Sequence, residues 1–235
     1  MADLGSHWLR RFGRERPEKI VCVGLNYKDH ASESEMQLPT EPLLFGKFSN
    51  TLVAPGEPIM LPAGIGHVDA EAELAVVIGR QAHAVRPDDA LDYVAGYSVA
   101  NDVSARELQF KDGQWFRGKG FDTFCPLLPE IVPVEDLGAA SDLRVVQRLN
   151  GVVIQDSRTS SLVFDVRTLV SHISTVMTLD PGDLILTGTP PGVGFFREPK
   201  LSLAPGDEVE VEVEGVGIVR NPVARSASGV GVSQH

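Results

Sequence analysis

The sequence contains little cysteine and no long apolar run. Cys22 and Cys125 are its only cysteines, too few for a disulfide framework to be the basis of the fold. No stretch approaches the roughly 20 apolar residues that a membrane-spanning helix needs. Residues 1–16 hold no apolar core of a signal peptide. We therefore expect a cytoplasmic protein that has no membrane partner.

An excess of positive charge is also missing. The 235 residues include 21 Lys and Arg against 32 Asp and Glu, for a formal net charge of -11. A negative chain is repelled by nucleic acids and by anionic membranes, so we expect neither as a partner. The hydrophobic fraction of 43% is typical of a soluble globular domain with a sizeable core.

The stretch Glu71–Gly79 is predicted to be a strand that is apolar on both faces. Side chains alternate along a strand, so Glu71 and Glu73 point the same way, and Ala75 and Val77 continue that face. A strand of this kind is covered on both sides, which places the two carboxylates close to the interior. An unpaired buried charge costs several kcal/mol, so we expect either a cation nearby or protonation of the acids.

A second stretch with the same acidic spacing serves as a control. In Glu208–Glu214, glutamate and valine alternate completely, which is typical of a half-buried strand with a solvated acidic face. Two glutamates at this spacing are therefore a weak signal by themselves. The uninterrupted apolar run after Glu73 distinguishes the first stretch from the second.

Asp102 is a third acidic candidate, at the end of the strand predicted over residues 93–102. It can also cap a helix predicted over residues 103–110, and one carboxylate can do both. Three carboxylates suit a hard ion such as Mg2+, Mn2+ or Ca2+. Zinc more often recruits His or Cys. Three protein ligands leave positions open for a chelating substrate or water.

Polar side chains elsewhere suggest further roles. His30 and Glu33 are neighbours on a helical turn, where the carboxylate can hold the imidazole as a general base. The alternative interpretation is a solvated helix end. Lys119 lies between two glycines, whose bare backbone lets an ammonium group approach a ligand closely. The hydroxyl of Thr189, in a Gly- and Pro-rich loop, can hold a carboxylate.

Turn residues and apolar runs predict many short strands and few helices. Asn150-Gly151 marks a tight hairpin turn within residues 144–156. Asp165 is expected to cap a helix, and residues 114–124 are expected to form a loop. The apolar face of that helix comprises residues 166, 169, 170, 173, 176 and 177. Together these patterns favour one β-rich α+β domain.

Five blocks of sequence resemble the fumarylacetoacetate hydrolase family. They are residues 24–30, 69–79, 101–106, 114–126 and 186–194. The resemblance covers residues 19–224, leaving 1–18 as an N-terminal extension and 225–235 as a disordered tail. It implies a mixed β-sandwich or roll with a few short peripheral helices. It also implies a homodimer with a site for Mg2+ or Mn2+, or alternatively Ca2+.

The resemblance assigns roles to particular residues. Glu71, Glu73 and Asp102 match the metal ligands of the family, in agreement with the burial argument. His30 and Glu33 match an acid/base dyad carried on a short segment that orders over bound substrate.

Further matches concern the substrate. Lys119 matches a lysine that faces the reacting carbonyl. The positions that match substrate contacts are Arg106, Gln109 and Thr189. Lys47 stands where members often have a lysine before Pro-Ser, but Phe48 follows it here.

The implied substrate is a small 2-oxo acid, chelated by the metal ion, which stabilises an enolate. We first expect hydrolytic C–C cleavage of a β-diketo acid of the acylpyruvate or fumarylpyruvate type. His30, held by Glu33, would activate water, and Lys119 would stabilise the oxyanion. The alternatives are an oxaloacetate-type decarboxylase and a 2-hydroxyhepta-2,4-diene-1,7-dioate isomerase of aromatic degradation. A non-catalytic metal-binding relative is the alternative from another class.

Overall fold

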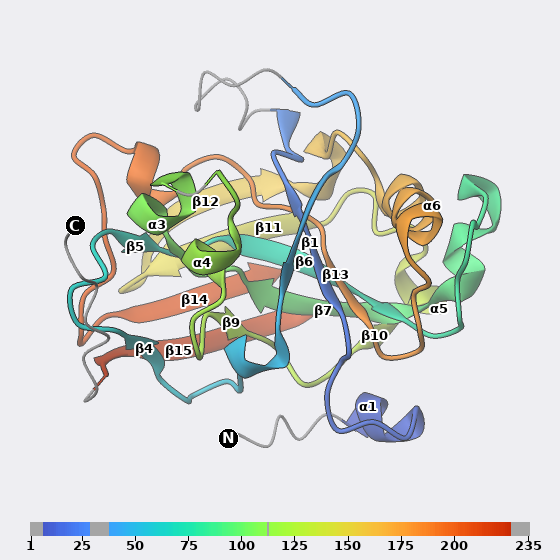
Figure 1. Cartoon of the computed structure of the whole chain (residues 1–235), viewed down its shortest axis with the longest axis horizontal. Coiled ribbons are helices and arrows are strands. Elements are labelled where there is room, and N and C mark those ends of the chain that lie inside the picture. The colour runs from blue at the N-terminus through green and yellow to red at the C-terminus, as the bar shows by residue number, and fades with distance from the viewer. Residues whose placement is uncertain (1–6, 29–37, 112, 227–235) are drawn as a thin grey trace.

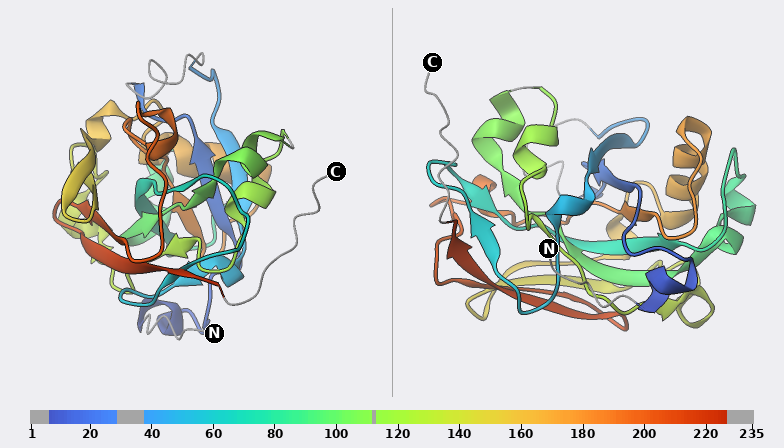
Figure 2. Two further views of the ribbon diagram at one scale, coloured as in Figure 1. Left: turned by 90° about the vertical axis from the view of Figure 1, so that its left-hand side faces the viewer. Right: turned by 60° about the horizontal axis from the view of Figure 1, so that its bottom comes forward.

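A computed structural model describes residues 7–28, 38–111 and 113–226. Two sheets form its body, and short helices lie around them (Figure 1). Strands of the two sheets contact one another and run in separate layers, as the right-hand view of Figure 2 shows. None of the helices in the described ranges is both long enough and apolar enough to cross a membrane.

The first sheet has six strands in the order β10-β7-β6-β13-β1-β2. They are β1 (Ile20–Gly24), β2 (Leu43–Lys47), β6 (Ala72–Ile78), β7 (Val94–Asn101), β10 (Val132–Pro133) and β13 (Leu184–Leu186). Strand β6 pairs antiparallel with β7 on one side and with β13 on the other. The strand predicted from Glu71–Gly79 is therefore an interior strand.

The second sheet has five strands in the order β12-β11-β14-β15-β4. They are β4 (Ile59–Leu61), β11 (Arg144–Leu149), β12 (Val152–Arg158), β14 (Glu208–Val213) and β15 (Gly217–Arg225). Asn150 and Gly151 have φ angles of 52° and 79°, which confirms the tight hairpin turn. On β14 the valines are buried and the glutamates reach solvent, as predicted.

The remaining elements are short. The helices are α1 (His7–Arg11), α3 (Arg106–Lys111), α4 (Phe116–Lys119), α5 (Val134–Leu137) and α6 (Val166–Val176). The 3-10 turns are η1 (Ser49–Thr51), η2 (Pro87–Tyr93), η3 (Thr159–Ser161) and η4 (Gly194–Phe196). Two-residue strands form the pairs β3 (Leu52–Val53) with β9 (Cys125–Pro126), and β5 (Val68–Asp69) with β8 (Ser104–Ala105). The predicted β-rich α+β class is confirmed.

Strand β6 has a different core on each face. Leu74, Val76 and Ile78 pack in the core that α6 and the five-stranded sheet also line. Ala75 and Val77 pack in a second core, together with residues of β1 and β13. By alternation, Glu71 and Glu73 belong to the side of this second core.

Helix α6 begins as predicted, because the side chain of Asp165 accepts a hydrogen bond from the Thr168 N–H at 2.9 Å. Its buried apolar side chains are Val166, Leu169, Val170 and Ile173. Val176 was predicted to join this face but is 60% exposed. It is the last residue of the helix and lies at the edge of the apolar arc, where nothing has to cover it.

The prediction of a loop over residues 114–124 was incomplete, because α4 forms within it. The carbonyl of Trp115 accepts hydrogen bonds from the N–H groups of Gly118 and Lys119. A Cβ atom at Gly118 would lie 2.8 Å from the carbonyl oxygen of Ala105. The missing side chain lets this helical turn pack directly against the neighbouring backbone, and that packing outweighs the weak helix propensity of glycine.

Asn26 connects three segments through its buried side chain. Its amide nitrogen donates to the carbonyls of Phe164 and Thr187 at 3.0 and 2.8 Å, and its oxygen accepts from the Phe164 N–H at 2.8 Å. We expect Asn26→Ala to lower the free energy of unfolding by about 3 kcal/mol, because buried polar groups lose their partners. Urea unfolding will measure this. Asn50→Ala is a matched control, expected to cost less than about 1 kcal/mol, because the two hydrogen bonds of Asn50 are exposed to water. Equal effects would contradict the assignment.

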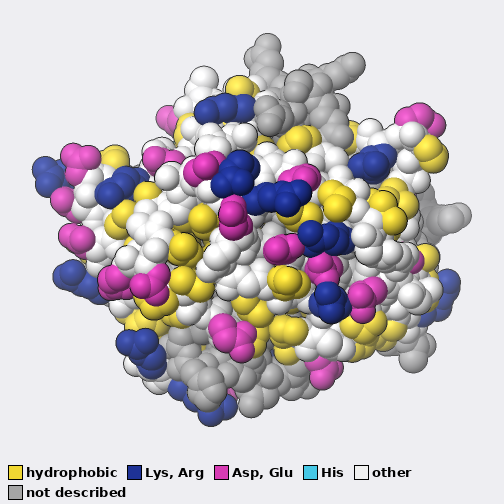
Figure 3. Space-filling model, turned by 180° about the vertical axis from the view of Figure 1, so that it is seen from behind, with side chains coloured by type: hydrophobic (Ala, Val, Ile, Leu, Met, Phe, Trp, Pro, Cys, Tyr) yellow, Lys and Arg dark blue, Asp and Glu magenta, His cyan; other side chains and the backbone are white. Residues whose placement is uncertain are grey.

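The face opposite to that of Figure 1 mixes charges of both signs. Figure 3 shows Lys and Arg side chains beside Asp and Glu side chains across this face, with apolar side chains between them. Among the described residues drawn there, no continuous basic area is formed.

Candidate metal and substrate site

The site lies where β6 begins and β7 ends. The two strands are antiparallel neighbours, and the Asp102 N–H donates to the Glu71 carbonyl at 2.9 Å. Oxygens from Glu71, Glu73 and Asp102 consequently lie within 4.8 Å of one another. These side chains are 5%, 1% and 0% exposed, respectively. The structure thus brings together the three acids that the sequence singled out, and Asp102 does not act as a helix cap.

Three buried cations, Lys119, Arg106 and Lys47, contact this acidic group. The ammonium of Lys119 lies 2.6 Å from Oε2 of Glu71 and 2.7 Å from Oδ2 of Asp102. The guanidinium of Arg106 lies 2.6 Å from Oε1 of Glu71. The expectation that a cation lies near the buried acids is therefore met by side chains of the chain itself.

Lys47 lies beside the same acids but is enclosed by backbone. Its ammonium is 2.7 Å from Oδ1 of Asp102, yet its N–H groups donate to the carbonyls of Val103, Lys119 and Phe124. Oδ1 of Asp102 is left without a hydrogen bond, although it is buried. This geometry makes Lys47 a support for Asp102, and we assign it no direct contact with substrate.

The pKa values of the two glutamates move in opposite directions. Burial raises the pKa of Glu71, but the charges of Lys119 and Arg106 outweigh burial and lower it to about 2. Burial also raises the pKa of Glu73, and the nearby charges of Asp102 and Glu71 raise it further, well above its usual range. Glu73 accepts a hydrogen bond from the Gly188 N–H at 2.7 Å. Within the described residues, no ion pair compensates its charge.

These observations fit a hard divalent cation. The acids offer only oxygen ligands, and among the described residues Oδ1 of Asp102 makes no hydrogen bond and Glu73 forms no ion pair. Glu71, Glu73 and Asp102 would hold the ion. Burial raises the pKa of Cys125 to about 12, and that of Cys22 well above its usual range. Both thiols are therefore neutral in the metal-free protein.

Because the pKa of Glu73 is raised, metal binding should be linked to protons. A protonated Glu73 must lose its proton to become a ligand, so we expect binding of Mn2+ to release protons and to weaken as the pH falls. Isothermal titration calorimetry in buffers of different ionisation enthalpy will count the protons. Proton release should diminish in Glu73→Gln. The same release from both proteins would show that Glu73 is not the linked group.

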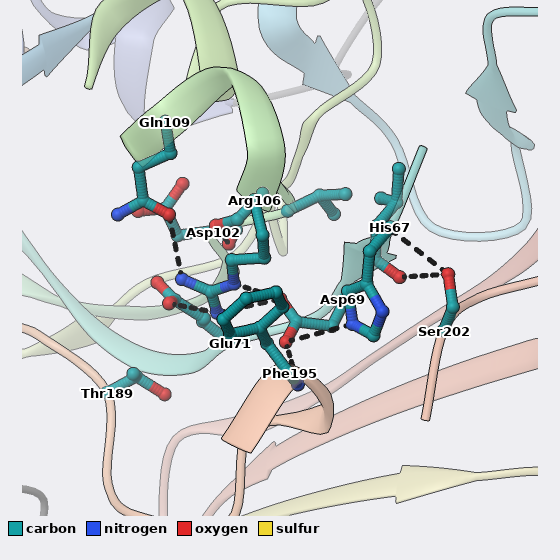
Figure 4. Close-up of polar contacts among 12 residues, drawn as sticks. His67, Asp69, Glu71, Asp102, Arg106, Gln109, Thr189, Phe195 and Ser202 are labelled. Atoms are coloured by element: carbon teal, nitrogen blue, oxygen red, sulfur yellow. Dashed lines mark hydrogen bonds and ion pairs between the residues drawn. The ribbon is translucent and has the colours of Figure 1, made fainter. Parts of the chain in front are cut away.

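Asp69 is a site residue that the sequence reasoning missed. It accepts from Nε of Arg106 at 2.7 Å through Oδ1 and from the Phe195 N–H at 2.7 Å through Oδ2 (Figure 4). Arg106 in turn donates to Glu71 at 2.6 Å and to Gln109 at 2.9 Å. Asp69 therefore orients Arg106 towards the acids. Asp69 lies two residues before Glu71, so strand alternation predicts that both side chains point to the same face. The sequence could therefore have indicated Asp69.

Aromatic side chains form much of the pocket beside these polar groups. The pocket is lined by Val23, Gly24, Leu25, Phe45, Glu71, Glu73, Arg106, Gln109, Phe110, Trp115, Lys119, Thr189 and Phe196. Trp115 packs edge-on against Phe45, with ring centroids 5.1 Å apart. A Cβ atom at Gly24 would lie 2.4 Å from the Trp115 ring, so only glycine leaves room for the indole.

The predicted acid/base pair consists of His30 and Glu33. His30 and Glu33 lie outside the described residues. Their roles remain predictions from the sequence, and the described part of the pocket brings together Glu71 and Glu73 with Lys119, Arg106, Gln109 and Thr189.

Comparison with known sequences identifies the class of protein. The family profile described as "Fumarylacetoacetate (FAA) hydrolase C-terminal" matches residues 19–224. The chain therefore belongs to the fumarylacetoacetate hydrolase family, as the sequence blocks predicted. The family generally uses a divalent metal, in keeping with the acidic triad.

Particular relatives carry different activities in their names. The chain is 46% identical over 209 residues to rat (Rattus norvegicus) mitochondrial oxaloacetate tautomerase Fahd2a, covering 88% of this chain and 67% of that protein. It also resembles the structure of 5-carboxymethyl-2-hydroxymuconate delta-isomerase from Mycobacterium smegmatis, with 47% identity and a TM-score of 0.81 over 90% of this chain and 80% of that one. The structure of 2-hydroxyhepta-2,4-diene-1,7-dioate isomerase from Mycobacterium marinum is also similar, with 46% identity and a TM-score of 0.80. The match covers 90% of this chain and 76% of that one.

Proposed function

We propose that this protein is a metal-dependent enzyme that enolises a small 2-oxo diacid, with keto–enol tautomerisation of oxaloacetate as the leading reaction. The observation that carries the proposal is the buried acidic triad, of which Glu71 and Glu73 line one pocket with Lys119 and Arg106. The relatives named above as a tautomerase and as isomerases support proton transfer as the reaction type. They favour this reading over the acylpyruvate hydrolysis that we first expected.

Mg2+ or Mn2+, held by Glu71, Glu73 and Asp102, would supply a Lewis acid where negative charge develops on the substrate. Lys119 supplies a fixed positive charge. Burial lowers the pKa of Lys119, but Asp102 and Glu71 raise it above its usual range, so the amine stays protonated. Lys119 is therefore suited to stabilise an oxyanion and unsuited to act as a base.

The remaining described residues bind and orient the substrate. The amide of Gln109 and the hydroxyl of Thr189 line the pocket beside the acids, and Arg106 is held in place by Asp69. The side chains of Phe45 and Trp115 form an apolar wall of this pocket. We assign the base that moves the proton to His30, supported by Glu33, on the basis of their positions in the sequence.

The test is a substrate panel measured with Mg2+ or Mn2+ and with a chelator. Loss of the enol absorbance of oxaloacetate reports tautomerisation, and pyruvate formation reports decarboxylation. Acetylpyruvate cleavage and isomerisation of a hydroxymuconate-type diacid are followed in parallel. We expect metal-dependent tautomerisation to exceed acetylpyruvate cleavage. Acetylpyruvate cleavage as the fastest reaction would reinstate the hydrolase, and no turnover above the metal-only background would favour a non-catalytic relative.

A further inference from the structure

A buried glutamine of the second sheet reaches the pocket. Gln155 is 1% exposed and is the only buried residue of β12. Its Oε1 accepts a hydrogen bond from the Ala72 N–H at 2.9 Å, at the first residue of β6. Its Nε2 donates to the Pro190 carbonyl at 2.7 Å and to the hydroxyl oxygen of Thr189 at 2.8 Å. One amide thus links β12, β6 and the loop that follows β13.

The orientation of this amide is fixed by its partners. The Ala72 N–H can only donate and the Pro190 carbonyl can only accept. Rotating the Gln155 amide by 180° would place a donor against a donor and an acceptor against an acceptor. Nε2 therefore faces Thr189, and the oxygen of the Thr189 hydroxyl is the acceptor in that contact.

The contact with Gln155 determines where the hydroxyl proton of Thr189 can point. Since the hydroxyl oxygen accepts from Gln155, its own O–H bond points elsewhere. Over residues 7–28, 38–111 and 113–226, the Thr189 hydroxyl has no acceptor of its own. Thr189 is 7% exposed and lines the same pocket as Glu71 and Glu73, and Figure 4 shows it on the loop beside Glu71. The pocket therefore receives a hydrogen-bond donor at this point.

We infer that Gln155 is a positioning residue that makes Thr189 an obligate donor to a carboxylate oxygen of the substrate. The inference rests on the proposed function, because the ligand class is a 2-oxo acid. A carboxylate oxygen can accept this proton, whereas an amide NH2 group at the same place would meet another donor. Gln155 does not line the pocket, and it affects the substrate only through its hydrogen bond to Thr189.

A double-mutant cycle between Gln155 and Thr189 tests the inference. The probe is oxalate, a dicarboxylate that mimics the chelating end of a 2-oxo acid, bound to the Mg2+-loaded protein and measured by calorimetry. Thr189→Val removes the donor with little change in shape and should weaken oxalate binding by about 10-fold. In the Gln155→Met background the same change should cost less than about 2-fold, because Thr189 is no longer oriented.

The kinetic readout separates positioning from a general structural effect. With the preferred 2-oxo diacid, Gln155→Met should raise KM by a larger factor than it lowers kcat. Gln147→Met is the matched control, because Gln147 is a buried glutamine on the adjacent strand β11. In that background Thr189→Val should keep its full effect. If Gln155→Met does not fold, Gln155→Glu replaces it in the double-mutant cycle. The glutamate keeps an acceptor for the Ala72 N–H but has no N–H group to donate to Thr189.

The outcomes are distinguishable. An equal effect of Thr189→Val with and without Gln155 overturns the inference while leaving the proposed function in place. Failure of the wild-type protein both to bind oxalate and to turn over any 2-oxo diacid overturns the proposed function, and the inference falls with it. A loss of coupling confined to the Gln155 variants supports the inference.

Discussion

Glu73→Gln is expected to reduce metal-dependent turnover by at least about 100-fold, since even groups that merely support a metal ligand are worth about 10–100-fold. The fold should persist, because glutamine keeps the shape of the side chain and can still accept from the Gly188 N–H. The pKa of Glu73 is already raised well above its usual range, so a neutral side chain at this position does not disturb the metal-free protein. Steady-state kinetics with Mn2+ and the calorimetric Mn2+ Kd will check the first expectation, and the Tm of the metal-free variant will check the second.

Glu208→Gln is the matched control for this variant. Glu208 begins the strand with alternating glutamates and valines and is exposed to solvent. The substitution is the same and the acidic spacing is the same, but no metal candidate lies there. Turnover and the Mn2+ Kd should stay at wild-type values. Full turnover by Glu73→Gln, or activity that survives chelation, would contradict the assignment of the metal site.

Lys119→Met should destabilise the metal-free protein by about 3–5 kcal/mol, because removing one partner of a buried ion pair leaves uncompensated charge. Lys119 is 1% exposed and contacts both Glu71 and Asp102. A divalent ion can replace the missing charge, because Oε2 of Glu71 and Oδ2 of Asp102 no longer contact the Lys119 ammonium. We therefore expect saturating Mn2+ to raise the Tm of Lys119→Met more than it raises the Tm of the wild-type protein.

Thermal unfolding with and without Mn2+ measures this difference. Lys111→Met is the control, since Lys111 is exposed at the end of α3. It should show the wild-type Tm and the wild-type response to Mn2+. Equal Mn2+ shifts for the wild-type protein and Lys119→Met would mean that the lysine and the metal do not share the same carboxylates. Turnover by Lys119→Met should also fall, because the oxyanion loses its fixed charge.

The sequence predicted those structural elements whose formation depends only on residues close together in the chain. The alternation around Glu71 and Glu73 gave both faces of β6 correctly, and Asn150-Gly151 gave the hairpin turn. The cap at Asp165 was also confirmed. In each case the physical cause lies within a few residues of the element, so an isolated sequence contains it.

Features that depend on distant contacts were not predicted. Helix α4 forms because Gly118 packs against the backbone of another segment, and no pattern within residues 114–124 reports that neighbour. In the sequence, Gln155 is one polar residue of a predicted hairpin. Its hydrogen bonds to Ala72 and Thr189 join segments that are far apart in the sequence, so no local pattern indicates them. Asp69 could have been found, because it shares the alternation of the two glutamates.

The type of reaction does not follow from the sequence alone. Hydrolysis was preferred because His30 and Glu33 are both present, but a competent base serves proton transfer equally well. The residues that surround the acids are common to both reactions, so side-chain type alone does not separate them. The relatives, with names that specify tautomerisation and isomerisation, shifted the proposal.

The acids and the aromatic side chains of the pocket come from different kinds of structure. Glu73 belongs to an interior strand, whereas Trp115 precedes a four-residue helix and Phe196 ends a 3-10 turn. Substitutions in such connecting segments are tolerated better than changes in a central strand. Substrate preference can therefore change through substitutions of aromatic pocket residues such as Trp115 and Phe196. The acids on the central strands, and the ion that they would bind, can stay the same.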